Sequence, residues 1–250
     1  MSQSNYSVTT NDFDAVLFDL DGVLTATAKV HAVSWKRMFD EFLSRLSQEN
    51  NELFVPFDID TDYKHYVDGK PRLEGVRSFL KVRGIQLPDG TQDTPVEEDT
   101  VYSLGKRKDQ IFNSILQNEG VEVYQTSVTW VCQLRSQGIK TAVVSSSRNC
   151  EAVLKAAEIT DLFDTRVDGK IAANLGIAGK PAPDTYLKAA EILDVEPKRC
   201  VVVEDAISGV QAGYAGGFGL VIGVNRNDDA DALLNNGAHI VVTDLGEILK

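Results

Sequence analysis

The chain has 250 residues, of which 43% are hydrophobic and 25% are charged, and its formal net charge is −12 at pH 7. This composition is typical of a globular protein with a well-buried core. The negative net charge argues against general nucleic-acid binding, because the phosphate backbone requires a basic face on the protein. An anionic small molecule is not excluded, since a local group of lysines and arginines reverses the sign inside one pocket.

The cysteines and the apolar runs give expectations about the compartment. Cys132, Cys150 and Cys200 form no CxxC pair, which favours a reducing compartment over a disulfide framework or a zinc site. Residues 1–14 lack the apolar core of a signal peptide. No apolar run approaches the roughly 20 residues needed to cross a bilayer. We therefore expect a cytoplasmic protein without a membrane partner.

The chain begins with one strand signal, AVLFD at 15–19, and then changes to helical patterns. Further helical stretches lie at about 72–83 and 98–119, separated by polar links that contain Pro, Gly and Asp. We interpret 27–123 as a helical cap inserted after the first strand. The apolar residues that recur at helical spacing at its start are Ala32, Trp35, Phe39, Phe42, Leu43 and Leu46.

The chain after the cap alternates strand and helix patterns. Near-continuous β-branched runs suit strands that are covered on both faces, as in a parallel sheet. The expected fold class is α/β, a doubly wound parallel sheet with an inserted α-helical cap domain. The core then comprises 1–26 and 124–250. Strands are predicted at 140–145, 200–204, 219–224 and 239–243, and helices at 150–158 and 184–193.

Polar and acidic side chains come directly after the predicted strands. Asp19 and Asp21 end the first strand, Ser145–Asn149 end the next, and Glu204–Asp205 end another. Lys180 lies in the loop GKPAPD, just before a helix. Ligands of open α/β sheets bind at the carboxyl ends of strands. We therefore expect two acidic pairs, a hydroxyl cluster and a lysine to meet at one edge of the sheet.

This combination suits chemistry on a phosphoryl group. A carboxylate can attack phosphorus and form an aspartyl phosphate, while Mg²⁺, a lysine and hydroxyl or backbone N–H donors offset the charge of the phosphate oxygens. Asp19 and Asp21 stand at i and i+2 and so face the same side of an extended segment. One can attack while the other moves a proton at the leaving oxygen. Gly22 lets the chain turn sharply beside the ligand.

Four stretches, DLDGVLT, VVSSSRN, KPAPD and VVVEDA, resemble in order the four motifs of the haloacid dehalogenase superfamily of phosphatases and phosphomutases. The resemblance runs over nearly the whole chain. It implies Asp19 as nucleophile, Asp21 as general acid/base, and Ser145 and Lys180 as phosphate ligands. It also implies a Mg²⁺ ion, with the ligands Asp19, Glu204, Asp205 and the backbone carbonyl of Asp21.

Other stretches are similar to the β-phosphoglucomutase family within this superfamily. TAKVHAVSW places Thr27 and His31 at that family's hinge and first cap helix, and GKPR and KRKD supply its cap cations. The resemblance implies that His31 couples cap closure to Asp21. It also implies that the non-reacting phosphate is bound by Arg72, Lys108, Ser147, Arg148 and Asn149.

The chain departs from that family at Ala26, Asp68 and Ala206, and its cap is longer between Trp35 and Arg72. These departures leave two enzymatic outcomes open. In a mutase the phosphoryl group returns to the sugar, whereas in a phosphatase water resolves the aspartyl phosphate. The first expectation is β-phosphoglucomutase-like transfer on a small sugar phosphate, and the alternative is a sugar-phosphate phosphatase of the same superfamily. A monomer is favoured.

A catalytically silent binding module is a third hypothesis, from a different functional class. It predicts that at least one of Asp19, Asp21, Lys180 or Asp205 is missing, and all of them are present.

Some charged stretches have simpler interpretations. DIDTD at 58–62 has the opening acids of a calcium loop, but Tyr63 occupies its glycine position, so we expect a solvated cap loop. Lys106 and Arg107 are expected on a solvated helix face. His65 and His239 carry no motif and are expected to be structural.

Overall fold

The computed structural model describes residues 8–226, 228 and 230–249. The chain divides into two compact units. The core unit is Met1–Ala26 with Val121–Lys250, and the helical unit is Thr27–Gly120. The second boundary therefore falls at 120, where the sequence pattern suggested 123. The roles of these units as a catalytic core and a cap stay a prediction.

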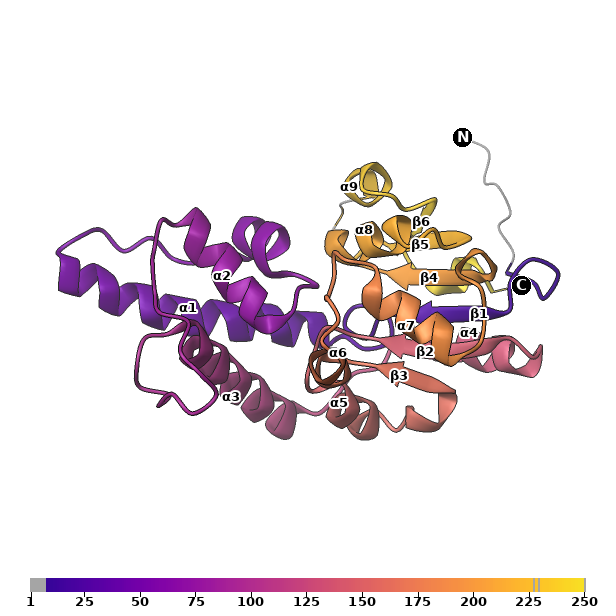
Figure 1. Cartoon of the computed structure of the whole chain (residues 1–250), viewed down its shortest axis with the longest axis horizontal. Coiled ribbons are helices and arrows are strands. Elements are labelled where there is room, and N and C mark those ends of the chain that lie inside the picture. The colour runs from indigo at the N-terminus through magenta and orange to yellow at the C-terminus, as the bar shows by residue number, and fades with distance from the viewer. Residues whose placement is uncertain (1–7, 227, 229, 250) are drawn as a thin grey trace. The chain divides into compact units, whose positions relative to one another are not determined.

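The core unit contains a parallel sheet with the strand order β3-β2-β1-β4-β5-β6. Figure 1 shows these strands side by side, from β3 at one edge to β6 at the other. The predicted fold class, a doubly wound parallel α/β sheet, is confirmed. The strands are β1 (Ala15–Phe18), β2 (Lys140–Val144), β3 (Thr165–Val167), β4 (Cys200–Glu204), β5 (Leu220–Val224) and β6 (Ile240–Val242).

Strand β3 was missed in the sequence because it is short and polar. Its residues are Thr165, Arg166 and Val167, and only Val167 is buried. Strand β1, one of the two central strands of the sheet, shows the opposite pattern, since each of its residues has an exposed fraction of 0%. Ala15 pairs with Lys140 on one side and with Cys200 on the other. A strand enclosed in this way reads as a continuous apolar run.

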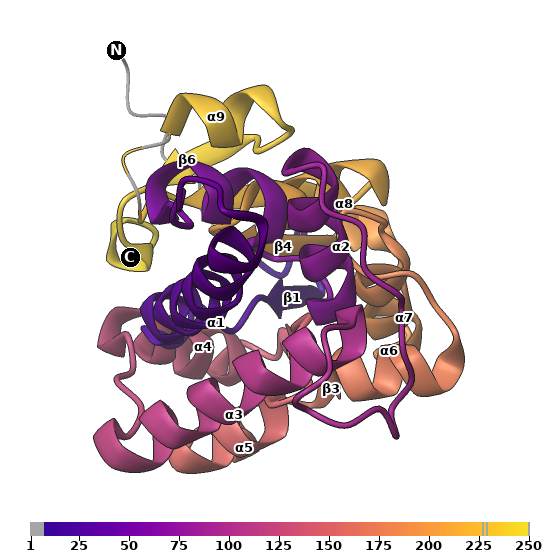
Figure 2. The same cartoon turned by 90° about the vertical axis from the view of Figure 1, so that its left-hand side faces the viewer.

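Helices cover both faces of this sheet, as Figure 2 shows for α7 and α8 on one side and α4 on the other. Tyr186 of α7 and Val210 of α8 pack in one cluster with Leu17 of β1. On the opposite face, Trp130 of α4 meets Phe18 edge to face, with ring centroids 5.5 Å apart. The helices are α4 (Gln125–Ser136), α5 (Cys150–Ala156), α6 (Gly169–Leu175), α7 (Asp184–Ile192), α8 (Ile207–Ala215) and α9 (Ala230–Asn235).

The helical unit is built around aromatic side chains. The rings of Phe39 and Phe79 have centroids 4.2 Å apart, and Phe57 lies 5.1 Å from Phe39. Burying rings of this size supplies much of the packing energy of so small a unit. Its elements are α1 (Thr27–Asn50), a π-helix at Ile59–Val67, α2 (Arg72–Val82) and α3 (Val101–Glu119).

The DIDTD stretch opens the π-helix, so its interpretation as a loop was wrong. The Asp58 side chain accepts a hydrogen bond from the backbone N–H of Thr61 at 2.8 Å and caps the helix. Tyr63 is buried in the aromatic cluster, with an exposed fraction of 7%. Asp58, the first acid of this stretch, therefore serves as a helix cap, a role for which Asp is well suited.

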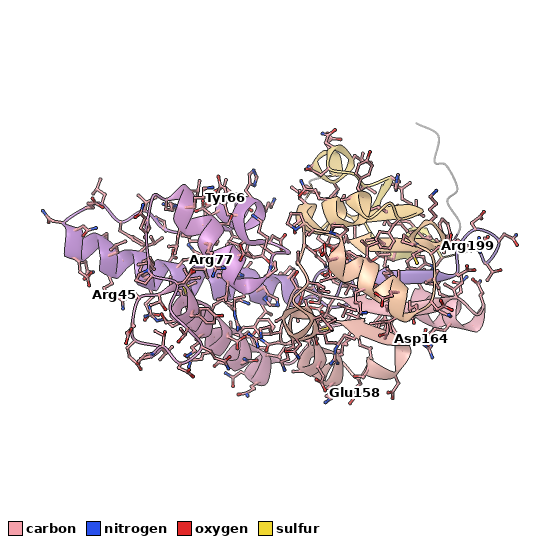
Figure 3. The ribbon with its side chains drawn as sticks, viewed as in Figure 1. Arg45, Tyr66, Arg77, Glu158, Asp164 and Arg199 are labelled. Atoms are coloured by element: carbon pink, nitrogen blue, oxygen red, sulfur yellow. The ribbon has the colours of Figure 1, made fainter. Side chains whose placement is uncertain are left out.

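Lys106 and Arg107 hold the connection between α2 and α3, so their interpretation as a solvated face was also wrong. Lys106 Nζ donates to the carbonyl of Thr94 at 2.8 Å. Arg107 Nε donates to the carbonyl of Val96 at 2.6 Å. The connection also carries Asp99, which pairs at 2.6 Å with Arg45 of α1; Arg45 is labelled in Figure 3. A long link without its own secondary structure gains its backbone partners from these cations.

Among the described residues, no helix has both the length and the apolar character that a membrane crossing requires.

Candidate active site

Asp19 and Asp21 lie where β1 ends and the chain turns. The Asp19 backbone N–H donates to the carbonyl of Val203 in β4 at 2.9 Å, which continues the ladder by one residue. Leu20 then points into the core, with an exposed fraction of 0%. Gly22 has φ +93°, a conformation that side chains with Cβ rarely adopt. The backbone therefore reverses direction at Gly22, and Asp19 and Asp21 both lie at the end of β1.

Lys180 lies buried among acceptors from three segments. Its Nζ pairs with Asp19 Oδ1, pairs with Glu204 Oε1 at 2.6 Å, and donates to the carbonyl of Val144 at 2.9 Å. Burial disfavours the ammonium ion, but the Asp19 and Glu204 carboxylates outweigh it and raise the pKa of Lys180. The lysine is therefore a fixed positive charge at the carboxyl edge of the sheet.

The Asp19 carboxyl is held in a largely dry environment. Burial raises its pKa, while the adjacent Lys180 ammonium acts in the opposite direction. Glu204 and Asp21 raise this pKa further through like-charge repulsion. Such crowding of acids is energetically costly without cations, and it is typical of functional sites.

Glu204 is enclosed by three donors and a glycine. Its Oε1 accepts from Lys180 and from the hydroxyl of Tyr186 at 2.7 Å, and its Oε2 accepts from the backbone N–H of Ala206 at 3.3 Å. A Cβ on Gly209 would stand 1.8 Å from Glu204 Oε1. Helix α8 can therefore approach the carboxylate only because residue 209 has no side chain.

The hydroxyl cluster after β2 meets the second aspartate. Ser145 Oγ donates to Asp21 Oδ2 at 3.4 Å and accepts from the backbone N–H of Ser147 at 3.1 Å. Ser147 Oγ in turn accepts from the N–H of Asn149 at 3.1 Å, at the start of α5. Arg148 is exposed between them. The structure thus brings Ser145 to the carboxylates and places 147–149 in the turn beside it.

The acidic residues at this edge fit a divalent cation. Asp19, Glu204 and Asp205 each offer a carboxylate oxygen, and these oxygens lie within 4.8 Å of one another. A Cβ on Gly22 would stand 1.8 Å from Asp205 Oδ2, so the loop closes on this carboxylate. An all-oxygen donor set suits Mg²⁺. Because Glu204 Oε1 already accepts from two donors, Asp19 and Asp205 are the stronger ligand candidates.

The helical unit brings two of its sequence-predicted residues together. Lys108 Nζ lies 2.5 Å from His31 Nδ1 and 4.7 Å from the centroid of the Phe112 ring. His31 stacks on the same ring with centroids 4.1 Å apart. Thr27 is buried at the start of α1. These positions group His31 and Lys108 between α1 and α3.

Arg72 lies at the start of α2 and pairs with Asp109 of α3. A Cβ on Gly105 would stand 3.6 Å from Arg72 Nε, so the arginine runs along the face of α3. Asp109, the neighbour of Lys108 in the sequence, therefore holds the Arg72 side chain in place. The predicted roles of Arg72 and Lys108 in binding a phosphate stay predictions.

Two residues of the core site were not singled out in the sequence. Tyr186 lies soon after Lys180 in the same stretch, KPAPDTY, and donates to Glu204. Arg226 comes after β5 and donates from Nε to the carbonyl of Gly22 at 2.8 Å, with its guanidinium 3.8 Å from the centroid of the Tyr124 ring. The strand-end argument that found Asp19 applies equally to Arg226, because β5 ends at the same edge.

Comparison with known proteins supports the interpretation of these motifs. Residues 13–217 match the family described as haloacid dehalogenase-like hydrolase. A β-phosphoglucomutase of Mycobacterium bovis is 48% identical over 238 residues, which cover 94% of this chain and 91% of the relative. A β-phosphoglucomutase of Bacillus subtilis is 34% identical over 212 residues, which cover 85% of this chain and 83% of the relative.

Solved structures share the fold. A haloacid dehalogenase family hydrolase from Deinococcus radiodurans has a TM-score of 0.63 at 29% identity, covering 95% of this chain and 93% of that one. A β-phosphoglucomutase from Clostridium difficile has a TM-score of 0.71 at 24% identity, with the same two coverages. These similarities agree with the resemblance that the four motifs indicate.

Proposed function

Because the chain belongs to the haloacid dehalogenase superfamily, in its β-phosphoglucomutase-like family, we propose that it is a Mg²⁺-dependent phosphomutase of a small sugar phosphate. The chain is an enzyme of this superfamily, and its relatives support phosphomutase or phosphatase activity. The observation that carries the proposal is the buried contact of Lys180 with both Asp19 and Glu204, beside Asp205.

Asp19 is the proposed nucleophile. Lys180 holds its Oδ1, and we assign the attack to Oδ2. A bond forms between this oxygen and phosphorus, and the bond from phosphorus to the sugar oxygen breaks. The fixed ammonium of Lys180 offsets the negative charge of the phosphoryl oxygens that approach a carboxylate.

Asp21 is the proposed acid and base. It gives a proton to the leaving sugar oxygen and takes one from the hydroxyl that later attacks the aspartyl phosphate. Ser145, which donates to Asp21 Oδ2, orients this carboxyl. The two aspartates act on the same phosphoryl group because the turn at Gly22 keeps both at the end of β1.

Asp19, Asp205 and the backbone carbonyl of Asp21 would hold the Mg²⁺ ion, with Glu204 as a further candidate. When bound, the ion neutralises charge on the phosphoryl oxygens. We assign the helical unit to a cap that excludes water. The residues proposed to bind the substrate or its phosphate are Thr27, His31, Arg72, Lys108, Ser145, Ser147, Arg148, Asn149 and Lys180.

The test is ³¹P NMR of the purified protein with Mg²⁺, β-glucose 1-phosphate and a trace of β-glucose 1,6-bisphosphate. Appearance of glucose 6-phosphate without inorganic phosphate supports the mutase. Asp19→Asn serves as the control for the nucleophile, because it keeps the shape of the side chain and removes the attacking oxygen. Turnover by Asp19→Asn at the wild-type rate contradicts the proposed mechanism.

A phosphatase is the second candidate, and one relative favours it. A phosphorylated carbohydrates phosphatase of Thermotoga maritima is 28% identical over 233 residues, covering 92% of this chain and 94% of the relative. It would use the same attack by Asp19, with water resolving the aspartyl phosphate. Inorganic phosphate as the product in the same NMR experiment identifies this outcome.

A further inference from the structure

Tyr186 is a buried tyrosine of helix α7, and its hydroxyl donates to Glu204 in the site. Its exposed fraction is 0%, and its ring meets Phe218 edge to face with centroids 6.0 Å apart. Lys180 Nζ lies 5.0 Å from the centre of the same ring. The ring alone would satisfy the packing of this cluster, because a phenylalanine fills almost the same volume. The hydroxyl therefore calls for a separate explanation.

The hydroxyl shares its acceptor with Lys180. An ammonium group has three N–H donors, and those of Lys180 meet Asp19 Oδ1, Glu204 Oε1 and the carbonyl of Val144. If Lys180 binds a phosphoryl oxygen, as the proposed function requires, one of these contacts must give way. Asp19 is the attacking group, and the Val144 carbonyl belongs to the end of strand β2. The contact with Glu204 is therefore the one available for exchange.

Glu204 could not lose this contact without a replacement. Its exposed fraction is 0%, and a buried carboxylate that loses its donors is strongly destabilised. The hydrogen bond from Ala206 reaches the other oxygen, Oε2, and is 3.3 Å long. Gly209 closes the remaining side of the carboxylate. Tyr186, at 2.7 Å, is the donor that stays on Oε1.

We propose that Tyr186 is a positioning residue: its hydroxyl keeps Glu204 Oε1 hydrogen-bonded while Lys180 turns an N–H toward the phosphoryl group. The inference rests on the proposed function for the phosphoryl group itself. It assigns to the tyrosine hydroxyl a role in catalysis that packing does not require. It also explains why two donors converge on a single oxygen of Glu204.

The test compares wild type, Tyr186→Phe, Glu204→Gln and the double variant, with Tyr214→Phe as the matched removal of a hydroxyl. Tyr214 lies on α8 and is 63% exposed. We expect Tyr186→Phe to stay folded with a lower melting temperature, to raise KM and to lower kcat about tenfold, the effect of one hydrogen bond to a charged group. Tyr214→Phe keeps wild-type kinetics.

The double variant separates the positioning role from a general one. If Tyr186 acts through Glu204, adding Tyr186→Phe to Glu204→Gln lowers kcat by less than about twofold. A full additional tenfold loss overturns the proposal, as does a Tyr186→Phe protein with wild-type kcat. Either result leaves the proposed function intact, because wild-type turnover is measured in the same series.

A binding measurement covers the case in which wild type turns over neither mutase nor phosphatase substrates. Calorimetric titration with inorganic phosphate in the presence of Mg²⁺ measures the affinity of the site around Lys180 for an anion, in the absence of any reaction. We expect Tyr186→Phe to weaken phosphate binding about tenfold. Equal affinities in wild type and Tyr186→Phe overturn the positioning role, whatever the substrate.

Discussion

Strands β1 and β4 have ion pairs at both of their ends, and the pairs at the two edges of the sheet differ in burial. At the edge where β1 and β4 begin lies Arg199, which Figure 3 labels. It pairs with Asp14, and the two side chains are well exposed, at 39% and 46%. At the edge where these strands end, Lys180 pairs with Asp19 and Glu204 and is 1% exposed.

The two edges differ in how far neighbouring segments bury their charges. An exposed ion pair competes with water and contributes little to stability. A buried pair must offset the desolvation of its ions, so removing one partner leaves an uncompensated charge. Helix α7 supplies Lys180's neighbour Tyr186, and Gly22 and Gly209 allow backbone to close on the carboxylates. Burial of otherwise ordinary charge pairs thus turns one edge into a candidate active site.

Removing the buried lysine should give the largest contrast between the two edges. Lys180→Met leaves the Asp19 and Glu204 carboxylates without their cation, so we expect the free energy of unfolding to fall by about 3–5 kcal/mol. Turnover should fall at least about 10²-fold, since a fixed charge at the proposed phosphoryl site is lost. Arg199→Met at the opposite edge should change both little. Urea unfolding and steady-state kinetics measure the stability and turnover of the two variants. Equal losses in Lys180→Met and Arg199→Met would show that the two edges of the sheet do not differ.

A methyl group at Gly22 should separate backbone strain from contact with the acids. Gly22 and Gly138 have φ values of +93° and +82°, so alanine at either site incurs a similar conformational penalty. A Cβ at 22 meets the Asp205 carboxylate, whereas the space around Gly138 is open to 4 Å.

We therefore expect Gly22→Ala to raise the Mg²⁺ concentration for half-maximal activity by about tenfold or more. Gly138→Ala should keep the wild-type Mg²⁺ dependence and lose only stability. Activity titrations with MgCl₂ and thermal unfolding measure the two properties. A similar Mg²⁺ dependence in both variants would show that the close approach to Asp205 does not matter.

Arg226 should have a smaller effect, because it acts on the turn and not on the phosphoryl group. Arg226→Lys keeps a positive charge but loses the planar stack on Tyr124 and the Nε hydrogen bond to Gly22. We expect kcat to fall roughly threefold to tenfold, because the turn that carries Asp21 is less well fixed. Arg135→Lys at the opposite edge is the control. Product formation at fixed times gives kcat for both variants. Equal kcat values in the two variants would show that Arg226 does not fix the turn.

The pH dependence of the exposed pair should give the smallest effect. The Arg199 guanidinium holds the pKa of Asp14 below its ordinary 3.8. A carboxyl whose folded-state pKa is lowered stabilises the fold above its unfolded-state pKa and loses that contribution as the pH falls through the folded value.

Wild type should therefore be slightly more stable than Asp14→Asn at pH 6, and the difference should vanish as the pH falls below 3.8. Urea midpoints measured from pH 6 to the acid limit of the fold test this. A difference that grows toward acid pH would contradict the sign of the shift.

The sequence predicted those parts of the site that stand directly after apolar strands. Asp19, Glu204 and Ser145 end runs whose burial is evident from their composition, and sheet topology brings strand ends together. Tyr186 could not be found in this way, because a tyrosine inside a helical apolar pattern reads as core. Its hydroxyl matters only through its distance to Glu204, which sequence spacing does not report.

The helical unit was harder to predict, since its polar residues serve its own structure. Asp58 caps a π-helix, and Arg107 donates to the carbonyls of the connection before α3. Both were interpreted as solvated, because the residue types that cap helices or donate to backbone carbonyls are the same charged types that cover a protein surface. Lys108, predicted as a substrate contact, is buried against Phe112 and His31.

The placement of β1 in the middle of the sheet has a consequence for synthesis on the ribosome. β1 is made first, but its two neighbours, β2 and β4, begin only at Lys140 and Cys200. The whole of Thr27–Gly120 is translated before either partner exists. Because the aromatic cluster of that segment is complete within itself, it can fold during this interval. The strand that carries Asp19 must then wait, unpaired, until the later part of the sequence closes the sheet around it.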